Sequence, residues 1–470
     1  MNAMKAGFAS ACITPMPGRD IPGLFERRLA AGTHDDLYVR AAVVDGGQPV
    51  ALVQVDAIVV PELVVARARR EAERLCGIPA AHCFIAATHT HSGGPLFGGF
   101  LSEPDGDYME FVAGQIAAAI SEAFRTRRPA LPGWRDAAAP GVAFNRRFLM
   151  KNGLQRTHPG KMNPDIVAPA GPEDPTVTVL SFCDPRTFAP LGCIVNFACH
   201  ATHMNGLLYS ADYVRWVVDT LRAAYGPGFG VVFLNGACGD VTQADNRSPR
   251  PFEFGPYWAE RTGRSVGGAA IQAVARTDYN LNTALACESV KVRAGIRAVS
   301  ADALREARQL LRKHELCAEN VETIYANELI KVHALREQCV HRKLEVMGVR
   351  VGDGMFWGVP AEFFQAFALD VAAASPFGHT CCVELANGYN GYVCAESAFA
   401  GGGYEVRTAR SSYLEEKAGA KIVRAAKALC LRMHDNARRE LASLRRTWPE
   451  YKDDSALDGI NQIGRKTRKR

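Results

Sequence analysis

The sequence lacks several features that would place it in a special class of protein. No uncharged apolar run reaches the roughly 18 residues that a transmembrane helix needs. The opening stretch, MNAMKAGFASACITPMPG, has one lysine and a weak apolar run that prolines soon interrupt, so we expect no signal peptide. There is no basic patch interleaved with aromatic residues and no nucleic-acid-binding module. We therefore expect neither a nucleic-acid partner nor stable insertion in a membrane.

Cysteine is present but has no pattern. The chain has 14 cysteines, with no CxxC pair and no regular spacing. Several of them, such as Cys193, Cys199 and Cys238, lie inside apolar runs. This is typical of buried free thiols in a reducing compartment rather than of a disulfide framework. We therefore expect a cytoplasmic protein.

The positive charge is concentrated at the end of the chain. The net charge is +6, and five basic residues stand among the last six positions. The folded body is therefore close to neutral. We interpret residues 448–470 as a basic, disordered tail, because a solvated end is the commonest fate of such a segment.

The remaining composition is that of a globular protein with a sizeable core. Of the 470 residues, 48% are apolar and 22% are charged. Residues 37–60 predict a β-hairpin around DGGQP, and the next segment predicts a helix that ends at Gly77. Strand and helix signals alternate through the first ~280 residues. The sequence therefore predicts an α/β fold, with mixed sheets flanked by helices.

No Pro/Ser-rich linker divides the chain. The charged segment 300–340 predicts a helical pair, and a long helix is expected from about Ser412 to Arg446. We therefore expect one large α/β domain over residues 1–447 that contains a helical excursion.

Chemistry-bearing residues gather where strands are expected to end. Four strand-like runs, FIAATHTHSGG, CIVNFACHATH, VVFLNGACGD and MFWGVPAEFF, lead into polar loops. In α/β folds such loops build the functional site, because the sheet holds them rigidly. Three or four His or Glu side chains from separate strand ends are a common arrangement for zinc. The polar residues at these tips are His89, His91, His200, His203, Asp240 and Glu362.

Each tip alone also fits a structural role. The two histidines of HTH lie on one face if the segment is a strand, but they are ordinary loop residues otherwise. His200 and His203 fit a one-turn helical pair or satisfied buried histidines. Asp240 could simply be a helix cap, and Glu362 could simply be an acidic residue at a helix N-terminus.

Two other segments contrast with each other. LANGYNGYVCAESAFAGGGYEV is rich in glycine and tyrosine and too long for a simple turn, which is typical of a loop that covers a site. THPGKMNP, at 157–164, has the composition of a plain loop.

Taken in order, the motifs AGFASACITP, THTHSGGP, NFACH, NGACGD, PAE and NGYNGYV…GGGYEV resemble the catalytic N-terminal domain of the neutral/alkaline (non-lysosomal) ceramidase family. The resemblance covers roughly residues 6–445. It implies a catalytic zinc ion (Zn²⁺) held by two histidines, a glutamate and a tyrosine. By motif position these ligands are His89, His200, Glu362 and Tyr392.

The resemblance also implies roles for residues that do not bind the metal. His91 would lie near the zinc without binding it, and we expect it to carry the proton from the water to the leaving amine. An arginine within FNRRF would contact the substrate carbonyl, either Arg146, which we favour, or Arg147. A second tyrosine, twelve residues after the ligand tyrosine, is Tyr404.

The chain departs from the family pattern in places that bear on the substrate. Ala201 stands where the family usually has proline, the family's PGE reads Pro360-Ala361-Glu362, and a proline is replaced near Gln243. We expect neither the secretion signal nor the C-terminal immunoglobulin-like domain of ceramidases. The sequence thus predicts a zinc-dependent hydrolase of an amide (N-acyl) bond, acting on a small or soluble compound rather than on ceramide.

Several alternatives stay open at this point. The same zinc could serve an esterase, a lactonase or a phosphatase, or a non-catalytic binding protein could hold a structural zinc. A lipid amide remains a possible substrate. Asp212 and Asp240 would either orient ligand imidazoles or cap helices. The oligomeric state and the part played by His203 do not follow from the sequence.

Overall fold

The computed structural model describes residues 4–447, so the basic tail predicted at 448–470 lies outside the described residues. The described chain forms three larger sheets, each covered by helices on one face. This arrangement confirms the predicted α/β class with mixed sheets flanked by helices.

The first sheet has five strands, which lie in the order β5 (Cys83–Ala87), β4 (Pro49–Val55), β3 (Tyr38–Asp45), β1 (Lys5–Cys12) and β6 (Arg128–Pro129). The predicted hairpin is the antiparallel pair β3–β4, and β5 runs parallel to β4. Two helices, α1 (Glu62–Cys76) and α2 (Gly106–Arg125), pack on this sheet. The helix α1 ends as predicted at Gly77, whose φ of 74° supplies the left-handed C-cap.

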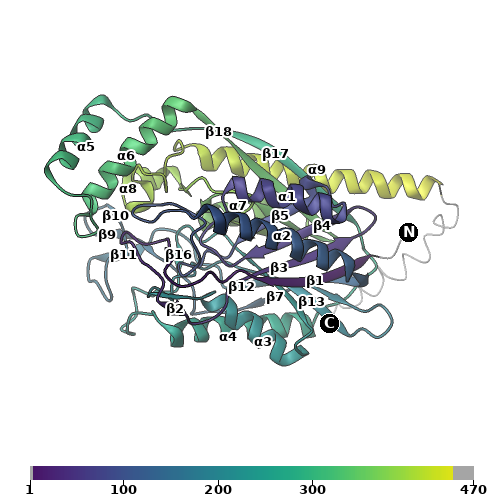
Figure 1. The fold of residues 1–470 in the computed structure, drawn as a ribbon. Coiled ribbons are helices and arrows are strands. Elements are labelled where there is room, and N and C mark those ends of the chain that lie inside the picture. Colours follow the sequence, from purple (N-terminus) through teal and green to yellow (C-terminus); the bar gives the residue numbers. More distant parts are fainter. Residues whose placement is uncertain (1–3, 448–470) are drawn as a thin grey trace.

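The second sheet has four strands, in the order β15 (Gly230–Asn235), β13 (Pro190–Phe197), β12 (Thr176–Cys183) and β7 (Leu131–Ala138). It is mixed, because β13 and β15 are parallel while β12 is antiparallel to both β13 and β7. The helices α3 (Tyr213–Tyr225) and α4 (Pro256–Ala275) cover it, along the bottom of Figure 1.

The third sheet also has four strands, in the order β17 (Leu285–Gly295), β18 (His341–Val351), β19 (Gly354–Gly358) and β21 (His379–Val383). The helices α7 (Gln365–Ala374) and α9 (Ala418–Thr447) pack against it, and α9 runs along the top of Figure 1. The predicted excursion is the helical pair α5 (Ala301–Lys313) and α6 (Val321–Gln338), inserted between β17 and β18. In Figure 1 this pair projects at the upper left.

The inner faces of all three sheets meet in one central core. Along β3, Ala41 and Val43 face the helices, whereas Ala42 and Val44 face this core. Strands that are buried on both faces read as continuous apolar runs, which explains sequences such as AAVV. The second and third sheets contribute side chains such as Leu180 and Phe356.

Three short strand pairs and one small three-stranded sheet connect loops at the ends of the large sheets. They are β14 (Leu208–Tyr209) with β2 (Gly32–Thr33), β16 (Val241–Thr242) with β8 (Phe144–Asn145), β20 (Glu362–Phe363) with β22 (Tyr392–Val393), and the trio β10 (Gln155–Thr157), β9 (Arg147–Met150) and β11 (Ile166–Pro169). The remaining elements are α8 (Glu396–Gly401) and the 3-10 turns η1 (Ala80–His82) and η2 (Tyr404–Val406).

Two expectations about element boundaries were wrong. The last helix begins at Ala418 rather than near Ser412, because Ser412 and Leu414 form bridges to other segments and are not free to be helical. The glycine- and tyrosine-rich segment is not a bare loop, since it contains β22, α8 and η2. Tertiary pairing fixes both segments, and local sequence does not reveal it.

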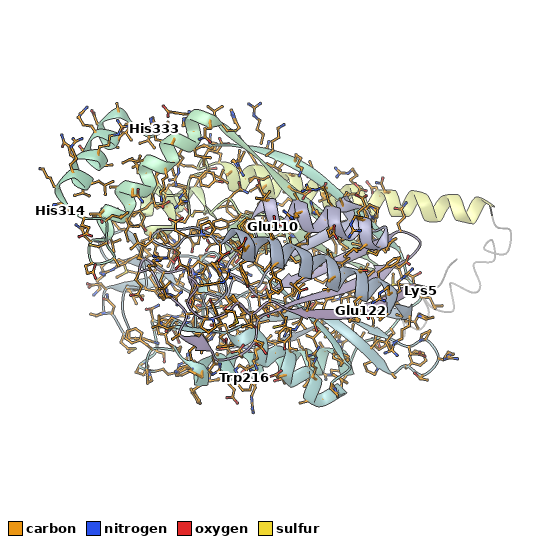
Figure 2. The ribbon with its side chains drawn as sticks, viewed as in Figure 1. Lys5, Glu110, Glu122, Trp216, His314 and His333 are labelled. Atoms are coloured by element: carbon orange, nitrogen blue, oxygen red, sulfur yellow. The ribbon has the colours of Figure 1, made fainter. Side chains whose placement is uncertain are left out.

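Many charged residues lie on the surface of the fold. Exposed side chains such as Lys5, Glu110 and His314 lie on the outside of the elements that carry them (Figure 2). Among the described residues, no helix combines the length and the apolar character that crossing a bilayer demands.

A buried glutamine joins the first two sheets. Gln54 on β4 accepts the N–H of Phe233 on the edge strand β15 at 2.8 Å, and its Nε2 donates to Asp56 at 2.7 Å. We expect Gln54→Leu to lower the free energy of unfolding by about 1–3 kcal/mol, because a buried donor and acceptor lose their partner. Urea unfolding measures this loss. The control Gln272→Leu, at an exposed position on α4, should change stability by less than ~0.5 kcal/mol. Equal effects of the two changes would contradict this role.

Candidate metal centre

Three histidines from two strand-end loops converge at one point of the fold. His89 follows β5 in a left-handed backbone conformation, with φ of 67°, and His91 lies in the same turn. His200 follows β13, and the backbone N–H of His91 donates to Ala201 O at 3.0 Å, which ties the two loops together. The metal-binding atoms of the three imidazoles all lie within 4.8 Å of one another.

Backbone carbonyls fix the orientation of each ring. The Nδ1 of His89 lies 2.8 Å from Ile58 O, and the Nδ1 of His200 lies 2.7 Å from Cys238 O. A carbonyl oxygen can only accept, so each Nδ1 carries the hydrogen and each neutral ring presents a lone pair at Nε2. Yet the two Nε2 atoms are only 3.0 Å apart. Two facing lone pairs repel each other unless a cation lies between them.

A carboxylate completes the cluster. The Oε2 of Glu362 lies 3.3 Å from His89 Nε2 and 3.4 Å from His200 Nε2, and it has no hydrogen-bond partner among the described residues. Donors bound at 2.0–2.1 Å to a tetrahedral zinc ion stand about 3.3 Å from each other. The separations in the cluster are close to this value, so the residues present fit a zinc ion.

The pairing of β20 with β22 brings a tyrosine to the same place. The two strands are parallel, with Glu362 directly opposite Tyr392. The hydroxyl of Tyr392 lies 3.5 Å from His200 Nε2. Tyr389 donates its hydroxyl to the other carboxylate oxygen, Glu362 Oε1, at 2.8 Å, and so fixes the direction in which Oε2 points.

His91 stands slightly apart from this group. Its Nδ1 lies 3.0 Å from Gly23 O, and its buried Nε2 has no partner among the described side chains. The ring centroids of His91 and His89 are 4.9 Å apart. His91 therefore presents a free lone pair close to the ring nitrogens of His89 and His200.

Burial and mutual charge set the protonation of the cluster. Burial lowers the pKa of His200 to about 3 and lowers the pKa of His91 well below its usual value, so both are neutral near pH 7. Burial also acts to lower the pKa of His89, but the Glu362 carboxylate raises it above its usual value. Burial opposes ionisation of Glu362, yet the two imidazoles hold its pKa well below the usual range. Imidazole nitrogens beside one carboxylate are a donor set that zinc accepts.

An arginine reaches the cluster from β8 and β9. Arg146 donates through Nη2 to Tyr392 OH at 3.1 Å and to Gly239 O at 2.6 Å, and its Nε lies 3.2 Å from Glu405. Arg147 points away from the cluster, toward Glu405 and Gln155. Of the two arginines left open by the sequence, the structure brings Arg146 to the site. Arg146 and Arg147 share the single carboxylate of Glu405. One of the two positive charges is therefore not neutralised by this carboxylate, which leaves positive charge next to the metal-binding atoms.

One cavity of about 320 Å³ contains all of the site residues predicted from the motifs. These residues are His89, His91, His200, Glu362, Tyr392, Arg146 and Tyr404. Tyr392 and Tyr404 are adjacent, with ring centroids 6.0 Å apart. The loops after β5 and β13, the β8–β9 connection and the β20–β22 pair, far apart in the sequence, therefore line one chamber.

The aspartates and His203 have structural positions. Asp212 caps α3 through Tyr213 N, and it accepts from Met204 N at 2.7 Å. His203 bridges Asp212 and Thr262, with its Nε2 3.0 Å from the Thr262 hydroxyl. Asp240 accepts from the N–H of Gln365 and from Asn145. The ring Nδ1 atoms of His89 and His200 meet carbonyls, so neither aspartate orients them.

Sequence reasoning missed several residues of the site. Tyr389 stands in the segment already singled out for its tyrosines, so composition gave a partial signal. His158, within the segment interpreted as a plain loop, lines the cavity, and burial next to Arg146 lowers its pKa to about 4. Glu405 and Glu384 gave no signal, because an isolated glutamate reveals its partners only in the folded state.

Glu384 supports the cluster from behind. Its Oε2 accepts the N–H of Cys238 at 2.9 Å and of Phe363 at 3.0 Å, and Cys238 Sγ lies 2.8 Å from Oε1. It therefore holds the carbonyl that orients His200 and the residue that follows Glu362. Burial raises the pKa of this carboxyl group to about 7.

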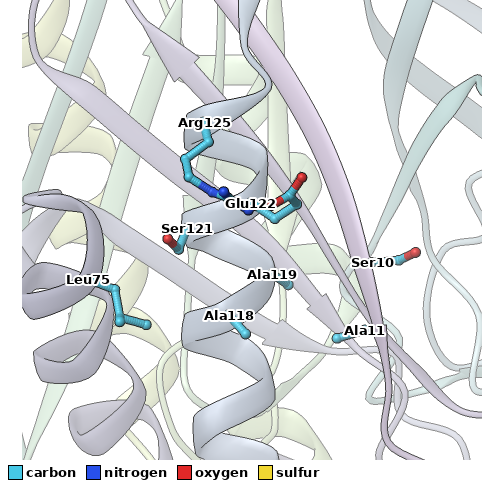
Figure 3. Close-up of a pocket in the computed structure, with 8 residues that line it drawn as sticks. All are labelled: Ser10, Ala11, Leu75, Ala118, Ala119, Ser121, Glu122 and Arg125. Carbon is cyan, nitrogen blue, oxygen red and sulfur yellow. Dashed lines mark hydrogen bonds and ion pairs between the residues drawn. The ribbon is translucent and has the colours of Figure 1, made fainter.

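A different hollow lies on the outside of α2. It is bounded by Ser10 and Ala11 of β1, Leu75 of α1 and residues of α2 that include the ion pair Glu122–Arg125 (Figure 3). No histidine or cysteine lines it. It has none of the donors that the metal cluster offers.

Comparison with known proteins rests on the fold. No protein-family model and no curated protein sequence matches the chain. Among solved structures, the neutral ceramidase from Pseudomonas aeruginosa matches with a TM-score of 0.71 over 92% of this chain and 75% of its own, at 19% identity. A ceramidase complexed with C2 matches with a TM-score of 0.70 over 92% and 76%, at 20% identity.

The chain has a neutral-ceramidase-like fold. The resemblance inferred from the motifs is thereby confirmed for the architecture, which covers most of the chain. At this level of identity the likeness concerns the ceramidase-like fold alone. The chemistry of the site depends on the residues of the cluster.

The buried carboxyl group of Glu384 makes stability depend on pH. Its pKa is about 7 in the folded state, against about 4.3 for an exposed glutamate. Between these values the folded state binds a proton that the unfolded state has lost, so stability falls as the pH rises. His91, His158 and His200, whose pKa values are lowered, act in the opposite direction, so the contribution of Glu384 has to be measured against a variant. We expect urea unfolding of the metal-free protein to show that the wild type loses stability relative to Glu384→Gln, which resembles the protonated form, between about pH 4.5 and 7.

The control for this experiment is Glu73→Gln, at an exposed position on α1. It should leave the pH dependence of the wild type unchanged. A difference in stability between the wild type and Glu384→Gln that does not change with pH would show that Glu384 does not titrate in this range.

Proposed function

We propose that the protein is a zinc-dependent hydrolase that cleaves an amide (N-acyl) bond. The observation that carries this proposal is the pair of facing Nε2 lone pairs of His89 and His200, 3.0 Å apart, with the unpartnered Oε2 of Glu362 at 3.3–3.4 Å. These groups form a site for a cation at the wall of a cavity. The ceramidase-like fold supports an amide as the bond that is cleaved.

In this proposal His89, His200, Glu362 and Tyr392 hold the zinc ion. Bound zinc would supply a water with a pKa near ~7 and polarise the substrate carbonyl. His89 and Glu362 are better ligands than His91, because their donor atoms stand at the separation that a tetrahedral ion imposes. The carbonyls of Ile58 and Cys238 keep the two ligand rings in the required tautomer.

The remaining polar groups have roles in proton transfer and charge stabilisation. His91, neutral and with a free Nε2, accepts the proton of the attacking water and passes it to the leaving amine. Arg146 and the hydroxyl of Tyr404 face the same cavity and donate to the oxygen on which negative charge develops. The shared carboxylate of Glu405 keeps Arg146 in place.

The unpaired cysteines are relevant to the cellular compartment of the protein. All 14 cysteines fall within the described residues, and all are unpaired. Free thiols are typical of proteins in a reducing environment, which supports a cytoplasmic location. The substrate in this proposal is a small N-acyl compound, with a lipid amide as the alternative.

Metal analysis tests the ligand assignment. We expect the purified wild type to contain about one zinc ion per chain and His89→Ala to lose it, because a site with one ligand fewer binds zinc far more weakly. His91→Ala should retain the zinc but lose turnover by about 10²–10⁴-fold, the usual contribution of a general acid–base group. His314→Ala, at an exposed position after α5, is the control and should behave as the wild type.

Two results would overturn this assignment. Loss of zinc in His91→Ala would make His91 a ligand. Equal zinc content in the wild type and in His89→Ala would show that His89 does not bind the zinc and that the proposed site is wrong.

A substrate panel tests the reaction. Amide, ester and phosphate compounds of matched size should be offered to the zinc-loaded protein with and without a chelator. We expect the amide to be hydrolysed and the chelator to abolish turnover, because the attacking water depends on the metal. Hydrolysis of the ester or the phosphate alone would favour a different zinc hydrolase. No chelator-sensitive turnover of any compound would favour a structural metal.

A further inference from the structure

The cavity beside the metal cluster is small. Its volume of about 320 Å³ lies at the lower end of the roughly 300–1,000 Å³ that small-molecule pockets span. A chamber at this end of the range suits a single compact group. The size of the chamber therefore bears directly on the substrate.

Aromatic side chains form one wall of this chamber. Phe97 lies against Tyr389, the tyrosine that fixes Glu362, with ring centroids 5.1 Å apart. Further along the wall, Phe25 and Phe100 are in contact, with centroids 4.7 Å apart. The apolar lining thus begins at a residue that positions the metal-binding carboxylate.

The helical insertion stands behind this wall. Tyr325 of α6 packs on Phe25 with a centroid distance of 5.8 Å, but it does not line the cavity itself. Arg407 stacks 3.5 Å above the ring of Tyr325 and forms an ion pair with Glu322 on the same helix. Tyr325 is buried, so its ring cannot move aside without breaking these contacts.

We propose that the substrate carries a compact apolar acyl group, aromatic or short, that packs against Phe25 and Phe100. This inference rests on the proposed amide hydrolysis and names the substrate class for the same site. Phe25 determines specificity by limiting the length of the acyl group. Tyr325 is a positioning residue that holds Phe25 in place, which gives the helical insertion a part in selectivity.

Planar groups suit this wall better than flexible chains do. Aromatic pairs at 4.5–7 Å prefer offset-stacked or edge-to-face contacts, and Phe25 already makes tilted ring contacts with two neighbours in this range. A flexible chain also loses more conformational entropy when it is confined in a short pocket. A benzoyl group therefore fits the chamber better than an extended chain of similar or greater volume.

The test uses one series of anilides that share the same leaving amine, with acetyl, benzoyl, octanoyl or dodecanoyl as the acyl group. We expect kcat/KM of the zinc-loaded wild type to be at least about tenfold higher for benzoyl than for dodecanoyl, the discrimination that an apolar pocket achieves by size. Phe25→Ala should reduce or reverse this ratio, because it lengthens the chamber. Tyr325→Ala should move the ratio in the same direction while leaving the zinc content unchanged.

Phe188→Ala, in the exposed turn between β12 and β13, is the matched control and should keep the wild-type ratio. A wild type that prefers dodecanoyl overturns the inference. So does an unchanged ratio in Phe25→Ala, which would show that this wall does not limit the acyl group.

A binding measurement separates this inference from the proposed reaction. Calorimetry with the same anilides and the zinc-free protein reports the fit of the acyl group without turnover. If no amide is hydrolysed but benzoyl binds at least about tenfold more tightly than dodecanoyl, the proposed function fails and the pocket assignment stands. If dodecanoyl binds as tightly as benzoyl, the pocket assignment fails whatever the activity.

Discussion

The site depends on two imidazole nitrogens that face each other across 3.0 Å. Each ring donates its Nδ1 hydrogen to a backbone carbonyl, so neither Nε2 atom can donate to the other while both rings are neutral. The arrangement is stable only with a positive charge between the rings, whether a proton or a metal ion. The Glu362 carboxylate raises the pKa of His89, and a metal ion would displace the proton that this carboxylate favours.

Much of the surrounding structure serves to hold this contact. The left-handed turn at His89, the β20–β22 pair and the buried carboxyl of Glu384 each fix one component of the cluster. Non-glycine residues in such a conformation are uncommon and tend to occur where the surrounding fold enforces a functional geometry. The three sheets supply the rigidity, because their inner faces share one densely packed core.

The helical insertion between β17 and β18 contacts the cavity only indirectly, through a residue of its wall. The helical pair supplies none of the metal-binding atoms of the cluster, yet Tyr325 packs behind a wall of the same cavity. A chain with this fold could change the length of its chamber by altering the insertion alone. The metal-binding atoms and the support behind this aromatic wall thus come from different parts of the sequence.

The amino-acid sequence by itself determined the class of fold and the strand-end positions of His89, His200 and Glu362, because alternating strand and helix patterns place such loops together. It also led to Arg146 and Tyr404 through a resemblance whose architecture the solved structures confirm. Only the tertiary structure shows that Arg146, and not Arg147, lines the cavity, because the two side chains leave adjacent positions toward different partners. The same holds for Asp212, Tyr389, Glu384 and Tyr325, whose partners are distant in the chain and meet only when the sheets pack.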